Sequence, residues 1–105
     1  MQAPIRTKKE LIERILSHQD NIRSYGVIQL GIFGSFVRDQ AIENSDVDFY
    51  VHFRPEYKTL KNFVGLANYL KTLLGRKVEI VTPQSLNKFI GKYIQQEVEY
   101  VPFAA

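Results

Sequence analysis

The chain has 105 residues, enough for one hydrophobic core, and we expect residues 1–105 to form a single domain. Its composition, 45% hydrophobic and 24% charged, is ordinary for a globular protein, and no apolar run approaches the ~20 residues that cross a bilayer. The absence of cysteine excludes disulfides and thiolate metal sites and fits the cytoplasm, while the net charge of +3 suits either a phosphate-bearing ligand or a solvated basic surface.

Helix and strand signals alternate along the first part of the chain. Thr7 followed by Glu10 is typical of a capping box, and the apolar residues behind it recur at helical spacing, which predicts a first helix to about His18. The apolar run VIQLGIFG at 27–34 is rich in β-branched residues and predicts a buried strand. Helical propensity then resumes over 35–42.

The second half continues the same alternation. The stretch DVDFYVHF at 46–53 alternates between polar and apolar residues and is the clearest strand, followed by an amphipathic helix over 60–74 and the short strand KVEIVT. The Thr-Pro pair at 82–83 is typical of a helix start and predicts a last helix through Leu86 to Val98, with VPFAA as a loosely held tail. Strands separated by helices predict an α/β domain with a small sheet covered by helices.

Two carboxylates, two residues apart, open the clearest strand. Because side chains at i and i+2 of a strand point to the same face, Asp46 and Asp48 can converge on one hard cation. Magnesium prefers carboxylate oxygens together with water and substrate phosphates. A solvated strand face is the alternative interpretation, and the pair alone leaves it open.

A Gly-Ser turn and an arginine precede this acidic pair. A strand that ends at Gly34, with Ser35 opening a helix, presents backbone N–H groups and a hydroxyl to an anion. Arg38 follows one turn later on the same side and can extend this phosphate cradle. A capping serine beside a surface arginine is the other interpretation, and the spacing of a P-loop is missing.

The two motifs together describe a site that neither describes alone. A phosphate cradle followed by paired acids can hold a magnesium-bound triphosphate and polarise its α-phosphate for in-line attack, helped by metals ~3.5–4 Å apart. A third carboxylate on a neighbouring strand normally completes such a cluster. Glu79, in the middle of KVEIV, is the candidate, because a charge inside a buried-looking strand requires a partner; an exposed strand acid is the alternative.

The motif region also resembles a known family. The stretch GIFGSFVRDQAIENSDVDFYV is similar to the nucleotidyltransferase signature of the polymerase-β superfamily, G-S-x-x-R followed about ten residues later by S-D-x-D. The short length and the stretches LLGRKVEIVTPQSL and IQQEVEYV resemble the minimal nucleotidyltransferase (MNT) group, many of whose members are antitoxins encoded beside a HEPN-domain toxin. This resemblance implies the nucleotidyltransferase fold, a small mixed β-sheet flanked by helices.

The resemblance also implies ligands and residue roles. It implies ATP as substrate and a two-metal Mg²⁺ site. Catalytic and metal-binding roles fall on three acids, Asp46, Asp48 and Glu79. Nucleotide-binding roles fall on three residues of the turn, Gly34, Ser35 and Arg38. The third acid of the family is usually aspartate, so the glutamate at position 79 is a departure from its pattern.

The activity that the resemblance implies is transfer of AMP from ATP to a hydroxyl, with tyrosine as the expected acceptor, on a cognate HEPN toxin bound in a hetero-oligomer. One alternative is an antitoxin that neutralises its toxin by binding alone, which the departure at Glu79 keeps open. Another is a small-molecule nucleotidyltransferase, which the lack of a substrate domain disfavours. We expect no membrane association, and no direct nucleic-acid binding because no stacking aromatics interleave a basic stripe.

Overall fold

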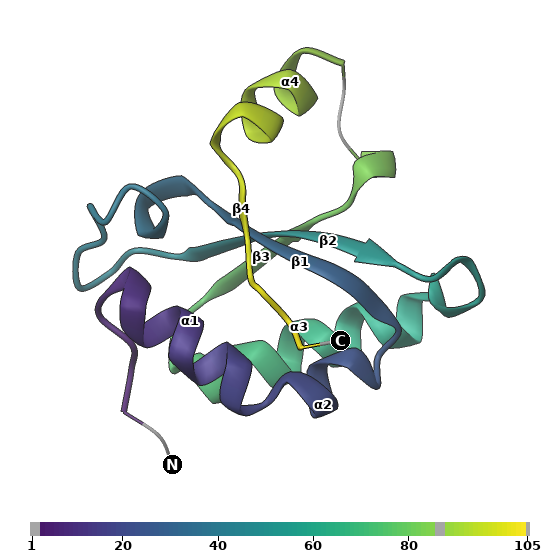
Figure 1. Ribbon diagram of the computed structural model, residues 1–105, viewed down its shortest axis with the longest axis horizontal. Helices are drawn as coiled ribbons and strands as arrows, with labels where there is room; N and C mark the ends of the chain where they lie inside the picture. The colour runs from purple at the N-terminus through teal and green to yellow at the C-terminus, as the bar shows by residue number, and fades with distance from the viewer. Residues whose placement is uncertain (1–2, 86–87, 105) are drawn as a thin grey trace.

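The sheet at the centre of the fold is mixed. A computed structural model describes residues 3–85 and 88–104 and shows four strands with helices on both sides (Figure 1). The strands lie in the order β3-β2-β1-β4, with bounds Val27–Phe33 for β1, Val47–Phe53 for β2, Val78–Val81 for β3 and Glu99–Tyr100 for β4. β1 is antiparallel to β2 and β4, whereas β2 and β3 are parallel. This arrangement confirms the predicted fold class.

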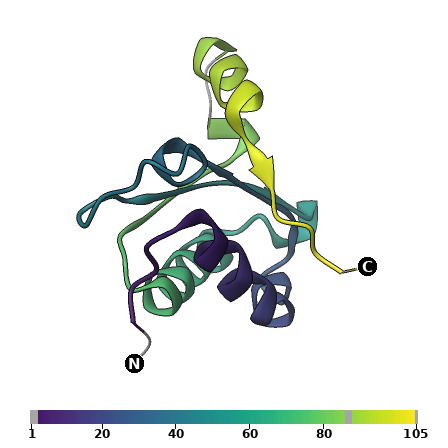
Figure 2. The ribbon, with the colours of Figure 1, turned by 60° about the vertical axis from the view of Figure 1, so that its left-hand side comes forward.

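Helices cover the two faces of the sheet unequally. The helices are α1 (Lys8–Ser17), α2 (Gln19–Arg23), α3 (Leu60–Leu74) and α4 (Lys88–Glu97). Figures 1 and 2 show α1, α2 and α3 on one side of the sheet and α4 on the other. The main hydrophobic core lies on the three-helix side, where alternate residues of β2 such as Phe49 pack with Leu11 and Leu70. No helix among the described residues is long and apolar enough to cross a membrane.

The helix ends follow the local sequence. Thr7 caps α1 by accepting the Glu10 N–H at 3.1 Å, as predicted, although the Glu10 carboxylate accepts the Arg6 N–H at 3.0 Å instead of the Thr7 N–H. α3 ends at Gly75, which has a φ of 67°. A Cβ at this position would lie 3.0 Å from the Cα of Pro4, so glycine both permits the turn and admits the neighbouring chain.

The predicted helix over 35–42 is wrong. The chain forms a single 3-10 turn, η1 (Gly34–Phe36), followed by further turns. Phe36 is fully buried, and Asp39 takes a positive φ of 55°, which a continuing helix does not allow. The Asp39 carboxylate accepts the Lys8 N–H at 3.3 Å, so a contact with α1 replaces helical hydrogen bonding.

The C-terminal predictions are also corrected. Pro83–Ser85 forms a 3-10 turn rather than the first turn of the last helix, which the structure begins at Lys88; Leu86 lies outside the described residues. The chain leaves α4 after Glu97 and forms β4, a strand that the sequence did not predict.

The segment after β4 is held rather than loose. The Val101 N–H donates to the Leu30 carbonyl at 2.9 Å, and the Val101 side chain is buried. Ala104 donates its N–H to the Gln19 side chain at 2.8 Å and accepts from the Arg23 guanidinium at 2.6 Å. The last described residues therefore belong to the packed domain.

Candidate functional site

Three strands bring the predicted site residues to one end of the sheet. Phe33, the last residue of β1, lies opposite Asp48 in the antiparallel register, so Gly34 follows directly beside Asp48. In the parallel register, Asp48 lies opposite Glu79. The end of β1, the start of β2 and the middle of β3 thus meet at one place, as the motifs predicted.

Gly34 has no room for a side chain. Its φ is 79°, and a Cβ built on it would lie 2.3 Å from Oδ2 of Asp48, well inside van der Waals contact. The Asp48 carboxylate therefore rests directly against the backbone of the turn. Only glycine satisfies the backbone angle and this close approach together.

The acids at this end of the sheet act on one another. Burial raises the pKa of Asp48 from 3.8 to about 6, and repulsion by Glu79 and Asp46, a hydrogen bond with Glu79 and the charge of Glu97 add to the shift. Asp48 is half-buried, whereas Asp46 and Glu79 are exposed. The site thus concentrates negative charge that a bound cation would relieve.

The carboxylates suit a hard cation in chemistry but are not arranged as a ready metal site. Within residues 3–85 and 88–104, no three His, Asp or Glu side chains are already placed to hold a metal ion. Asp48 and Glu79 are paired with each other, and Asp46 lies just before β2 begins. The three carboxylates offer oxygen donors, lie close together and repel one another. These properties fit Mg²⁺, which keeps part of its water shell and needs few protein ligands.

The turn binds an anion that the chain itself supplies. The Gly34 N–H donates to Oε2 of Glu97 at 3.3 Å, and the Arg38 guanidinium forms an ion pair with Oε1 of the same carboxylate. Ser35 follows Gly34 and is half-buried. Glu97, the last residue of α4, was not among the predicted site residues, because nothing in its local sequence indicates that α4 folds back over the turn.

A second residue that the sequence did not single out fixes the loop in front of Asp46. Arg76 donates from Nε to the Ile5 carbonyl at 2.7 Å, and its guanidinium carbon lies 5.0 Å from the centre of the Phe36 ring. Its Nη1 is within 2.9–3.0 Å of three loop carbonyls, those of Ile42, Glu43 and Ser45. No local pattern marks Arg76, because the carbonyls that it contacts lie more than 30 positions away in the sequence.

Aromatic rings continue the polar face of β2 beyond Asp48. Tyr50 is 3% exposed, and its ring meets that of His52 edge-on with centroids 4.9 Å apart. Nε2 of His52 lies 3.1 Å from the Tyr100 hydroxyl on β4. Burial, with the nearby Lys58 charge, lowers the pKa of His52, and burial raises that of Tyr100. Tyr50 and His52 thus lie between Asp48 and Phe53, the last residue of β2.

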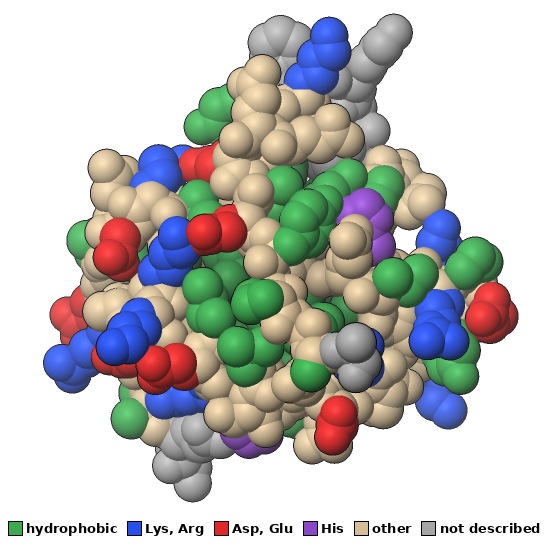
Figure 3. Space-filling model, viewed as in Figure 1, with side chains coloured by type: hydrophobic (Ala, Val, Ile, Leu, Met, Phe, Trp, Pro, Cys, Tyr) green, Lys and Arg blue, Asp and Glu red, His purple; other side chains and the backbone are tan. Residues whose placement is uncertain are grey.

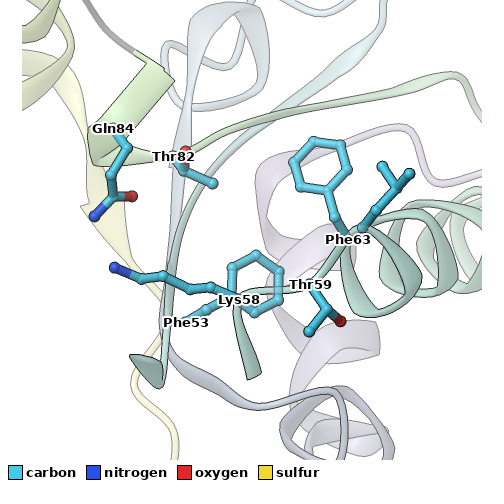
Figure 4. Close-up of a pocket in the computed structure, with 7 residues that line it drawn as sticks. Phe53, Lys58, Thr59, Phe63, Thr82 and Gln84 are labelled. Carbon is cyan, nitrogen blue, oxygen red and sulfur yellow. The ribbon is translucent and has the colours of Figure 1, made fainter. Parts of the chain in front are cut away.

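A separate pocket lies near the other end of β2. It has a volume of about 350 Å³, and Phe53, Phe63 and the stem of Lys58 line it (Figure 4). Because Phe53 ends β2 and Asp48 stands near its start, this pocket is distinct from the acidic cluster. Thr82 and Gln84, just after β3, complete its opposite wall.

Comparisons with known proteins show the family of this chain. A family model described as nucleotidyltransferase domain matches residues 8–103. The protein adenylyltransferase MntA of Thermococcus cleftensis is 45% identical over 94 residues, which cover 88% of this chain and 94% of that protein.

Solved structures share the fold. One described as a "putative minimal nucleotidyltransferase" matches with a TM-score of 0.78 and 28% identity, over 89% of this chain and 94% of that one. A toxin–antitoxin crystal structure with AMP-PNP matches with a TM-score of 0.66 over 89% of this chain and 73% of that one; at 23% identity it shows the fold alone.

Proposed function

The chain belongs to the nucleotidyltransferase family, and on this premise we propose that it is a magnesium-dependent protein adenylyltransferase acting as an antitoxin. It transfers AMP from ATP to a hydroxyl, with tyrosine as the expected acceptor, on a HEPN-domain toxin. The observation that carries this proposal is the meeting of the Gly34 turn with Asp48 and Glu79 at one end of the sheet. The name of the 45%-identical relative, a protein adenylyltransferase, supports the reaction class.

The acids divide the chemistry between them. Asp46 and Asp48 are the residues that would hold Mg²⁺, with Glu79 completing the set. When bound, the metal supplies charge neutralisation at the α-phosphate. The acceptor oxygen bonds to the α-phosphorus, the bond to the bridging oxygen of the β-phosphate breaks, and pyrophosphate leaves. Glu79, which is exposed, takes the proton of the acceptor hydroxyl.

The turn positions the triphosphate. The Gly34 N–H and the Ser35 hydroxyl lie at the start of η1, where backbone donors point outward. Arg38 is 44% exposed, so its guanidinium can reach a ligand that enters from solvent. These three residues orient the nucleotide while the acids act on its α-phosphate.

The acceptor is a protein. Exposed aromatic side chains lie close to the site on α4 and β4, with Tyr93 60% and Tyr100 40% exposed. Figure 3 shows hydrophobic side chains at the centre of the face that carries β4, with charged side chains around them. Such a surface suits a protein partner. We further propose that residues 1–105 work as one domain, in the cytoplasm, where ATP and magnesium are available.

The test is AMP transfer to the partner. The chain is incubated with the HEPN protein and with ATP labelled at either the α- or the γ-phosphate, with magnesium or with chelator. We expect α-label on the partner only when magnesium is present. Glu79→Gln keeps the size of the side chain and should reduce the rate ~10²–10⁴-fold. Glu79→Asp, which restores the usual acid of the family, is the matched control and should keep activity.

Two outcomes contradict the proposal. Label from the γ-phosphate would indicate a kinase. If α-label never reaches the partner while the Asp46→Asn/Asp48→Asn variant still neutralises the toxin, the chain acts by binding alone.

A further inference from the structure

We propose that Glu97 is a further residue of the nucleotide site, where its carboxylate takes the place of a phosphate group and leaves when nucleotide enters. The inference rests on the proposed nucleotide-binding function. It assigns to the end of α4 a direct influence on how tightly the turn binds ATP.

The first argument is that Glu97 uses the same donors that a phosphate would use. Each of its two carboxylate oxygens has its own partner, Oε1 the Arg38 guanidinium and Oε2 the Gly34 N–H. Backbone N–H groups in a turn and guanidinium groups bind carboxylates and phosphates in the same way. While this contact lasts, the Gly34 N–H and Nη1 of Arg38 are occupied by the carboxylate.

The second argument is burial. The Glu97 side chain is 14% exposed, whereas its partner Arg38 is 44% exposed. An ordinary surface ion pair leaves both partners in water. Here the carboxylate is covered and the arginine faces solvent, which places Glu97 on the inner side of the pair, against the turn.

The third argument is that the backbone of Glu97 is anchored while its side chain can turn away. Next to it, Val98 packs so closely on β1 that a Cβ on Gly31 would lie 2.4 Å from its Cγ2. The Val98 N–H also donates to the Ile94 carbonyl at 2.8 Å and closes the helix. In this proposal the α4 backbone stays in place, and the Glu97 side chain alone leaves the donors.

The charges favour this exchange. Glu97 adds its negative charge to the same cluster as Asp48 and Glu79, and among residues 3–85 and 88–104 the contacts with Arg38 and Gly34 hold its carboxylate there. A triphosphate brings more negative charge to Arg38 than one carboxylate does. For a ligand that must displace Glu97, the apparent affinity is the intrinsic affinity multiplied by the fraction of molecules in which the donors are free.

The experiment compares Glu97→Gln, Glu97→Ala and wild type. The dissociation constant for ATP is measured by calorimetry with magnesium and again with chelator, and thermal melting shows that each variant is folded. We expect both variants to bind ATP about three- to tenfold more tightly than wild type under both conditions. Glu99→Gln is the matched control, because Glu99 is two residues away, exposed and paired with Lys8, and it should bind like wild type.

A double-mutant cycle identifies the contact. Because the gain depends on freeing Arg38, Glu97→Gln should bring a smaller gain in an Arg38→Ala background. If Glu97→Gln binds ATP like wild type, or more weakly only when magnesium is present, as the loss of a metal ligand would cause, the inference is overturned. If folded wild type and Glu97→Gln both fail to bind ATP, the proposed function fails and the inference fails with it.

Discussion

The two faces of the sheet differ in their side chains: one packs the apolar core and the other carries the acids. Neighbouring residues of β2 show this contrast. Phe49 is fully buried in the cluster formed with α1 and α3, whereas Asp48, one residue earlier, faces the opposite side and lies against the Gly34 turn. The first face is held by apolar packing. The second is held by paired polar groups, among them Arg38 with Glu97.

Within the single strand β2, the residues that stabilise the fold therefore differ from the residues that we propose for the site. On the face covered by α1, α2 and α3, the buried apolar side chains contribute to folding. On the polar face, acids are held near one another although they repel, which costs stability and which a bound cation would relieve. Substitutions on the two faces should therefore differ in sign as well as in size.

The largest change in stability is expected on the apolar face. Phe49→Ala removes a large, fully buried ring and should lower the free energy of unfolding by about 3–5 kcal/mol, because a cavity remains among the packed side chains. Urea unfolding measures this change. A loss below about 1 kcal/mol would mean that the core collapses around the gap and that this face is less rigid than its packing indicates.

A smaller loss is expected at Arg76, which holds the loop in front of Asp46. Arg76→Ala removes a charged donor from three loop carbonyls and from the Phe36 ring, and should cost about 1.5–3 kcal/mol. Amide hydrogen exchange over residues 42–45 should accelerate, because these carbonyls lose their anchor. The exposed Arg54 provides the control: Arg54→Ala should leave both quantities unchanged. Unchanged exchange in Arg76→Ala would contradict the proposed anchoring.

The smallest change is expected at Asp48 and has the opposite sign. The pKa of about 6 in the folded state lies above the ordinary value of 3.8, so the folded state binds this proton more tightly. Stability from this group is complete below pH 3.8 and is lost as the pH rises through about 6. Asp48→Asn should therefore raise the free energy of unfolding at pH 8 by about 1–2 kcal/mol, after allowance for solvent screening, while AMP transfer is abolished.

Urea unfolding between pH 4 and pH 8 tests this sign. Wild type should lose stability relative to Asp48→Asn as the pH rises, and magnesium should reduce the difference, because a bound cation relieves the repulsion. If Asp48→Asn is less stable than wild type at pH 8, the charged Asp48 carboxylate stabilises the fold. That result would contradict the destabilisation expected from its burial and from the neighbouring acids.

Local patterns predicted the elements that those patterns determine. β2 and α3 were predicted because alternation and helical spacing extend through each of them. Glu79 was expected near Asp48 because a charge in the middle of an apolar strand requires a partner, and the structure places the two opposite each other. The helix predicted over 35–42 failed, because burial of Phe36 overrides local propensity. A tertiary contact decides the path of the chain there.

Residues whose role depends on distant contacts could not be predicted. Glu97 meets Arg38 across 59 positions of the sequence, and Arg76 reaches the loop at 42–45 across more than 30 positions. β4 has only two residues and exists because the edge of β1 accepts it, so no periodic pattern marks it. For these features the sequence lacks a local signal, and only the folded chain brings the partners together.

The parallel pairing of β2 with β3 also has a consequence for synthesis of the chain. Parallel neighbours require a crossover, and here the crossover contains α3, which is made before Glu79. As a ribosome delivers the chain from its N-terminus, the Gly34 turn and Asp48 emerge early, without the residues that accompany them in the folded domain. The acidic end of the sheet therefore stays incomplete until β3 and α4 have been made, and Glu97 is the last of its charged groups to be made.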